Sequence, residues 1–229
     1  MPEYPKWIRR AKMAIEVVFT QKDYVEGLKA LPVTLKGSFY SNSFPQNCLY
    51  YQGNGIYSGD CWNSVVKAYI WGKGVLPKNV GSYWFNPGRY GMGDWNGRQI
   101  LDHCYDISLN FEKIIPGEYL LTEAEDHAAV YVGETKATFD GVERVYNVVE
   151  CTPIWANGIQ YSYLDSKGRR FQCKGGAQAG SWKYHAKLPW IEYPSELSYT
   201  VKSENGKQIL EVDGKGKFEI STTTIVKKL

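Results

Sequence analysis

Residues 116–134, PGEYLLTEAEDHAAVYVGE, mark the point at which helical patterning gives way to strand-like patterning. Two short apolar runs inside this stretch, 119–121 and 128–132, have the length and composition of strands. The segment VERVYNVVECTP follows after a Phe-Asp-Gly turn and predicts an antiparallel hairpin partner for the second run. GIQYSYL and KLPWIEY predict further strands toward the C-terminus.

Upstream of this stretch, apolar residues recur at helical spacing in residues 5–31, and Pro32 ends the pattern. Residues 61–72, CWNSVVKAYIWG, predict a second helix, and residues 97–104 predict a short third one. The segment SKGRRFQCKGGAQAGS indicates an exposed loop. Helices that precede strands are typical of an α+β fold, here with N-terminal helices packed on an antiparallel β-sheet.

The composition excludes several classes of protein. Hydrophobic residues make up 43% and charged residues 22%, which is typical of a globular chain. The net charge is only +3 and Lys and Arg form no long run, so we expect no nucleic-acid partner. No stretch approaches the ~20 apolar residues of a transmembrane segment, and the N-terminus lacks the apolar core of a signal peptide. The protein is therefore expected to be made in a cytoplasm.

Known cofactor motifs are missing from the sequence. The five cysteines form no CxxC pair, and HExxH, P-loop and dinucleotide-binding motifs are absent. We therefore expect no metal and no other cofactor.

The chain of 229 residues fits one domain with a short appendage. We place the boundary between residues 1–193 and 194–229, where charged residues become more frequent and a proline stands at the junction. The appendage weakly resembles half of a short cell-wall-binding repeat, and a β-hairpin is an equally good interpretation.

Cys61 is the candidate nucleophile because it stands at the predicted start of the helix 61–72, after a glycine-containing loop. Helix N-termini carry partial positive charge and free N–H groups, which favour the thiolate and can bind an oxyanion. Cys48 is a weaker alternative because no clear helix follows it.

A cysteine nucleophile needs an imidazole to take its proton, and His127 opens the predicted strand 128–132. Glu150 lies near the end of the predicted partner strand, from which its carboxylate can orient the imidazole. Asp126 is an alternative orienting residue, although neighbours on a strand point to opposite faces. An isolated histidine or glutamate at a strand end is otherwise an ordinary structural residue.

Five blocks of the sequence together resemble the NlpC-type cell-wall cysteine peptidases of bacteria and phages. They are GDCWNSVVKAYIWG, DISLNFEKIIPGEY, DHAAVYVGE, VVECTPIWANGIQ and WKYHAKLPWIEY. The resemblance implies a papain-like fold, with Cys61 as nucleophile, His127 as base and Glu150 as the third catalytic residue. It also implies a phage endolysin-like enzyme that cleaves an amide bond of peptidoglycan through a thioester intermediate.

The expected partner is therefore bacterial peptidoglycan, reached after release or delivery from the host cytoplasm. Trp62, Tyr50 and Tyr51 are candidate substrate-binding residues, because aromatic side chains suit sugar and peptide grooves. The resemblance adds Asp60 as a candidate, because relatives with an Asp-Cys-Ser-Gly motif hold a free peptide amine with this aspartate. The sequence departs from the family where Trp62 and Asn63 replace the small residues that usually follow the cysteine. Two alternatives stay open: an acyltransferase or transglutaminase-like enzyme with the same three residues, and a catalytically inactive wall-binding protein.

Overall fold

The computed structural model describes residues 17–41, 49–54, 56–67, 83–84, 96–138, 141–194, 199–204, 207–212 and 216–220. The chain divides into two compact units, Met1–Tyr193 and Pro194–Leu229. In the described part of the chain, no helix is long and apolar enough to cross a membrane.

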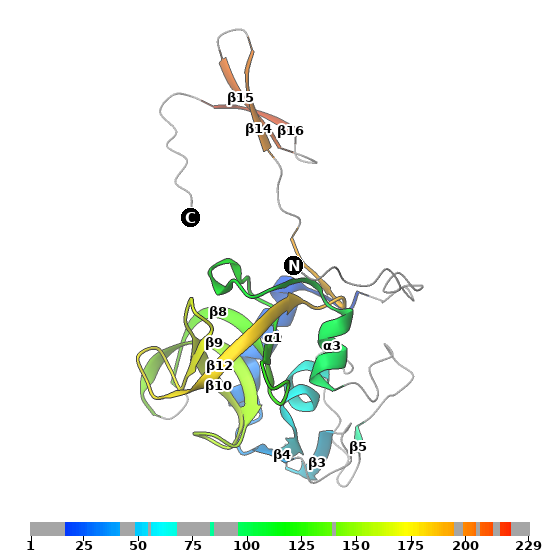
Figure 1. Ribbon diagram of the computed structural model, residues 1–229, viewed down its shortest axis with the longest axis vertical. Coiled ribbons are helices and arrows are strands. Elements are labelled where there is room, and N and C mark those ends of the chain that lie inside the picture. Colours follow the sequence, from blue (N-terminus) through cyan, green and yellow to red (C-terminus); the bar gives the residue numbers. More distant parts are fainter. Residues whose placement is uncertain are drawn as a thin grey trace. The chain divides into compact units, whose positions relative to one another are not determined.

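Short helical segments and many strands make up the first unit (Figure 1). Its helical segments are α1 (Gln21–Thr34), η2 (Trp62–Lys67, a π-helix), α3 (Gly97–His103) and η3 (Phe111–Lys113, a 3-10 helix). Its strands are β1 (Phe19–Thr20), β2 (Phe39–Tyr40), β3 (Leu49–Gly53), β4 (Ile56–Gly59), β5 (Tyr83–Trp84), β6 (Tyr105–Ser108), β7 (Tyr119–Thr122), β8 (Ala128–Thr138), β9 (Glu143–Thr152), β10 (Gly158–Leu164), β11 (Arg169–Phe171), β12 (Gln178–Lys187) and β13 (Ile191–Glu192).

A closed antiparallel β-barrel is the centre of this unit. Strands β11, β10, β9, β8, β7 and β12 are hydrogen-bonded in that order, and the pairing of β11 with β12 closes the circle. Strand β6 adds to the outer edge of β12. Two smaller sheets accompany the barrel, a parallel pair of β1 with β13 and a four-stranded sheet in the order β2-β4-β3-β5.

This barrel corrects the predicted fold class. The prediction of an α+β, papain-like fold with N-terminal helices packed on a β-sheet is wrong, because the unit is mostly β and, in its described residues, α-helix is confined to α1 and α3. The difference arises in the segment SKGRRFQCKGGAQAGS, which forms β11 and the start of β12 instead of a loop. Its turn needs Gly168, whose φ is +75° and whose added Cβ would lie 2.6 Å from the Phe111 ring.

The predicted helices are only partly present. Helix α1 begins at Gln21, with Thr20 as its N-cap, and continues through Pro32 to Thr34. The earlier part of the predicted helix 5–31, before Val17, lies outside the described residues. Residues 62–67 of the predicted helix 61–72 form a π-helix, and the residues beyond 67 are not described. The short helix predicted for 97–104 is confirmed as α3, whose capping box joins Asn96 and Gln99.

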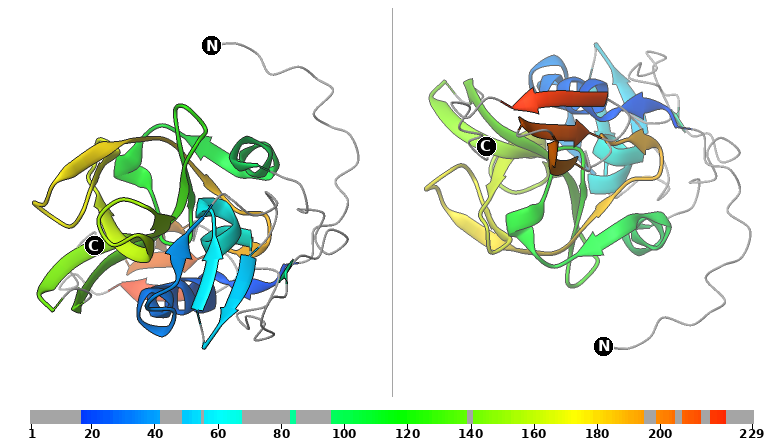
Figure 2. Two further views of the ribbon diagram at one scale, coloured as in Figure 1. Left: turned by 90° about the horizontal axis from the view of Figure 1, so that it is seen from below. Right: turned by 90° about the horizontal axis from the view of Figure 1, so that it is seen from above.

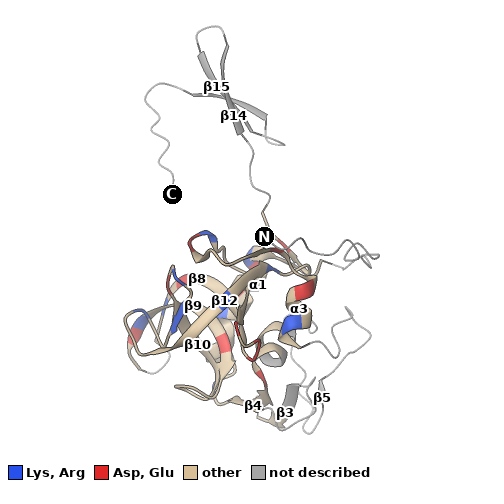
Figure 3. Cartoon of the chain, in the orientation of Figure 1, with Lys and Arg blue, Asp and Glu red and all other residues tan. Residues whose placement is uncertain are grey.

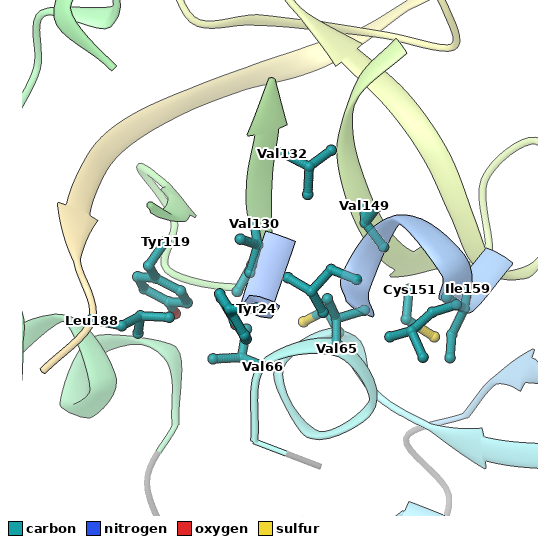
Figure 4. Packing of buried hydrophobic residues seen from close by; sticks show 14 of the residues in the cluster. Tyr24, Val65, Val66, Tyr119, Val130, Val132, Val149, Cys151, Ile159 and Leu188 are labelled. Carbon is teal, nitrogen blue, oxygen red and sulfur yellow. The ribbon is translucent and has the colours of Figure 1, made fainter. Parts of the chain in front are cut away.

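The two faces of the barrel strands carry two separate hydrophobic clusters. Side chains inside the barrel form the inner cluster, made by Phe111, Leu120, Ala129, Val148, Leu164 and Trp182. Alternate residues of the same strands point outward and pack in the outer cluster with residues of α1 and η2. Figure 2 shows the ribbons of α1 and η2 beside the barrel. Figure 4 shows Val65 and Val66 of η2 against Val130 and Val149 of this outer cluster. The start of η2, with Cys61, is thereby fixed against β8 and β9.

Charged residues of both signs are distributed over the first unit, as Figure 3 shows on α3. There Arg98 Nε donates to Asp102 at 2.8 Å, and its Nη1 donates to Glu125 at 2.9 Å. Such mixed pairs agree with the small net charge of +3.

The second unit contains a three-stranded antiparallel sheet. It consists of β14 (Tyr199–Glu204), β15 (Lys207–Val212) and β16 (Gly216–Ile220), in sequence order. Each strand pairs with the next along the chain, as in two consecutive hairpins.

Candidate active site

Cys61 follows β4 and Asp60 directly and stands at the start of η2. Its side chain is 1% exposed and belongs to the outer cluster. The backbone N–H groups of Ala128 and Trp62 donate to its sulfur. The thiol is therefore held beside the first residue of β8, whose neighbour in the chain is His127.

The surroundings of Cys61 favour the neutral thiol in the resting protein. Burial raises the pKa of the Cys61 thiol well above its ordinary value, and the nearby Asp60 raises it further. The N–H groups of Ala128 and Trp62 lower this pKa, but they do not outweigh burial. A reaction at Cys61 therefore needs a base that removes the proton.

His127 lies at the end of the β7–β8 turn, where its backbone N–H donates to Thr122 Oγ1 at 3.2 Å. Its ring stacks on Trp182 with 5.3 Å between the ring centroids. Nε2 lies 2.5 Å from Glu150 Oε2. Within the described part of the chain, Nδ1 of His127 has no hydrogen-bond partner, so this nitrogen remains available.

Glu150 is completely buried. It is on β9, where it lies opposite Ala129 of the paired strand β8. The guanidinium of Arg170 donates to both of its oxygens, from Nε to Oε1 at 3.1 Å and from Nη2 to Oε2 at 2.5 Å. Burial alone raises the pKa of Glu150, but the hydrogen bond from His127 and the charge of Arg170 outweigh it and lower this pKa to about 2. Glu150 is therefore ionised across the ordinary pH range.

Arg170 is a further candidate site residue, which the sequence analysis missed. Its segment was predicted to be an exposed loop, yet Arg170 is only 5% exposed. Its guanidinium carbon lies 5.0 Å from the ring centroid of Trp155 and 5.6 Å from that of Trp182. The available signal was the pair Arg169-Arg170, because adjacent residues of a strand point to opposite faces and one of two arginines must then point inward.

Cys61 lies on the outer face of the barrel strands, whereas Glu150, which binds His127, lies on their inner face. The Cys151 thiol donates to the Gly59 carbonyl at 3.6 Å, which places the Cys61 side of the site on the outer face of β9. Glu150, the neighbour of Cys151, points into the barrel. Between Cys61 and His127, both of which the structure describes, no hydrogen bond is formed. Proton transfer therefore requires His127 Nδ1 and the Cys61 sulfur to come closer together than they are at rest.

Of the predicted substrate-binding residues, Asp60 is buried and close enough to Cys61 to influence its pKa. Trp62 is half-buried and packs against the outer cluster. Tyr50 and Tyr51 are on β3, but their side chains lie outside the described residues, as does Cys48.

Tyr40, which the sequence analysis did not single out, shares the electrostatic environment of the site. Burial raises its pKa to about 12, with Cys61 and Asp60 as further causes. The residue carries no sequence signal, because its place near Cys61 depends on the pairing of β2 with β4.

The described residues contain no group of three or more His, Cys, Asp or Glu side chains that could hold a metal ion. No protein-family model, curated protein or solved structure matches this chain.

Proposed function

We propose that the protein is a cysteine hydrolase in which Cys61 attacks an amide carbonyl and His127 moves the proton. The observation that carries this proposal is the position of Cys61 beside Ala128, next in the chain to a histidine that Glu150 holds through Nε2. Two of the other described cysteines are engaged elsewhere: the Cys104 thiol donates to the Ile100 carbonyl at 3.3 Å and the Cys151 thiol donates to the Gly59 carbonyl at 3.6 Å.

The proposed reaction has two steps. His127 Nδ1 takes the proton of the Cys61 thiol, the sulfur adds to the amide carbonyl, and His127 returns the proton to the leaving amine. Water, activated by the same imidazole, then hydrolyses the thioester and regenerates the thiol. The N–H groups of Trp62 and Ala128, which donate to the sulfur at rest, are the candidate donors for the oxyanion.

Bacterial peptidoglycan is the proposed substrate, with the stem peptide or the sugar–peptide amide as the target bond. This part of the proposal is supported by the five sequence blocks alone. The chemistry is supported separately, by the environment of Cys61 and His127.

The test compares the wild type with Cys61→Ala on purified peptidoglycan of several wall chemistries, by turbidity and by mass spectrometry of released fragments. The proposal predicts thiol-dependent clearing by the wild type, with new amine and carboxyl ends that identify the bond. Cys61→Ala should stay folded, since Ala is compatible with a helix start, and should release nothing. Equal release by the two proteins would refute Cys61 as the nucleophile, and no release by a folded wild type would refute the substrate.

A further inference from the structure

We propose that Arg170 is a positioning residue that keeps Glu150 ionised and thereby fixes the proton of His127 on Nε2. This inference rests on the proposed function, because it makes Nδ1 the nitrogen that receives the Cys61 proton.

The hydrogen bonds around Glu150 determine which atoms carry protons. An arginine side chain only donates, and it remains protonated in proteins. Since Arg170 donates to both carboxylate oxygens, at 3.1 and 2.5 Å, Glu150 has only acceptor positions left. Oε2 also lies 2.5 Å from His127 Nε2, so this nitrogen must be the donor. In the neutral imidazole, Nδ1 then carries the lone pair.

Arg170 is itself held from several sides. Nη2 donates to Thr152 Oγ1 at 3.1 Å, two residues along β9 from Glu150. The indole rings of Trp155 and Trp182 lie against the guanidinium, at 5.0 and 5.6 Å. Trp182 also stacks on the His127 ring. One aromatic side chain therefore contacts both the positioning residue and the base.

The turn that carries Trp155 is built rigidly. Trp155 has a φ of 63°, in the left-handed region that bulky residues rarely adopt. The buried Gln160 side chain holds this turn, by donating to the Ile154 carbonyl at 2.9 Å and accepting from the Ala156 N–H at 3.2 Å. Such a conformation persists only where the surrounding structure enforces it, which here fixes one ring over Arg170.

Loss of the Arg170 charge should change which atoms of Glu150 and His127 carry protons. A buried carboxyl without a compensating cation favours its neutral form. Protonated Glu150 would donate to Nε2, the imidazole proton would move to Nδ1, and the base for Cys61 would be lost. A residue that only supported the barrel would leave this tautomer unchanged.

The test is long-range proton–nitrogen NMR of the histidine rings, at a pH where imidazoles are neutral, because it shows which ring nitrogen carries the proton. His103 and His185 are internal references. The variants are Arg170→Met and Arg170→Gln, which remove the charge, and Arg170→Lys, which keeps it. Arg169→Met is the matched control, because Arg169 is a neighbouring arginine whose Nε donates to Asp165 at 2.7 Å on the exposed side of β11.

The expected result is an Nε2–H tautomer of His127 in the wild type, in Arg169→Met and in Arg170→Lys, and its loss in Arg170→Met and Arg170→Gln. Retention of Nε2–H in either folded charge-removing variant would overturn the inference, as would an Nδ1–H tautomer in the wild type. If Arg170→Met does not fold, Arg170→Gln provides the same test. The readout needs no substrate, so it stands apart from the peptidoglycan assay, whose failure would concern only the proposed function.

Discussion

Two histidine–glutamate pairs of the barrel have the same 2.5 Å contact and different surroundings. In the first, His127 Nε2 meets Glu150, the ring is 12% exposed, and Nδ1 has no partner within the described residues. In the second, His185 Nδ1 meets Glu118 and Nε2 lies 3.0 Å from the Asn110 carbonyl, with both side chains at most 4% exposed. The first pair has a nitrogen to offer to Cys61, and the second has none.

The difference shows that a short histidine–carboxylate contact does not by itself indicate catalysis. The His185 ring packs on Phe111, with 5.1 Å between the ring centroids, and its two acceptors occupy both nitrogens. This pair joins β12 to the residue that precedes β7, which suits a structural role. The Glu150 carboxylate is shared with Arg170 and leaves the base free, which suits a functional one.

The largest difference between the pairs should appear in turnover. His127→Ala is expected to lower the rate of amide cleavage by about 10²–10⁴-fold, the range for loss of a general base. It should lower the free energy of unfolding by only about 1–2 kcal/mol, because Glu150 remains paired with Arg170. Glu150→Gln should lower the rate less than His127→Ala does. The measurements are initial rates and urea unfolding, and a greater loss of rate in Glu150→Gln would contradict the orienting role.

His185→Ala should have the opposite effects, a large loss of stability and little change in turnover. It leaves Glu118 buried at 3% exposure without its hydrogen-bond partner, which is expected to cost about 3 kcal/mol of folding free energy. Protein that remains folded should keep the wild-type kcat. Urea unfolding combined with active-site titration separates the two quantities, and a kcat loss per folded molecule as large as that of His127→Ala would abolish the distinction between the pairs.

Acid should reduce the contribution of ionised Glu150 to folding stability over a defined pH range. The pKa of Glu150 is lowered from its ordinary 4.5 to about 2 in the folded protein, so its ionised form stabilises the fold above pH 4.5 and this contribution is lost as the pH falls through about 2. The difference in unfolding free energy between the wild type and Glu150→Gln should therefore be constant above pH 4.5 and shrink below it. A difference that does not change down to pH 2 would contradict the ion pair with Arg170.

The smallest expected signal is the ultraviolet absorbance of the Cys61 thiolate, which reports whether the thiol keeps its proton at rest. Because burial and Asp60 raise the pKa of the Cys61 thiol, Cys61 should contribute no thiolate absorbance at 240 nm at neutral pH. The difference spectrum between the wild type and Cys61→Ala measures this directly. A thiolate band at neutral pH would indicate a preformed ion pair instead of general-base activation.

Local patterns predicted the elements around the site. The apolar runs 119–121 and 128–132 are part of β7 and β8, the hairpin partner is β9, and GIQYSYL is β10. Each of these strands carries its own alternation or apolar run, so no long-range information was needed. The strand predicted at KLPWIEY was less accurate, because Lys187 ends β12 and only Ile191 and Glu192 form a further strand, β13, which pairs in parallel with β1.

The closure of the barrel could not be predicted in the same way. Strand β11 has only three residues, Arg169–Phe171, and two of them are arginines that suggest solvent exposure. Its inward residue is stabilised by Glu150, a partner from β9, and its pairing with β12 closes the barrel. Both facts depend on contacts between distant segments, so the fold class and Arg170 were missed together. Cys61, His127 and Glu150 could be proposed from the sequence because each stands at or near the end of an element that has a local signal.

The most direct test of the account is the rate at which iodoacetamide alkylates Cys61 at neutral pH, followed by peptide mass spectrometry in the wild type, His127→Ala and His103→Ala. His103 is an exposed histidine at the end of α3 and serves as the matched control. The account predicts that His127→Ala slows alkylation of Cys61 at least about tenfold, because the thiol loses its base, and that His103→Ala equals the wild type. Equal rates in all three folded proteins would contradict the pairing of Cys61 with His127.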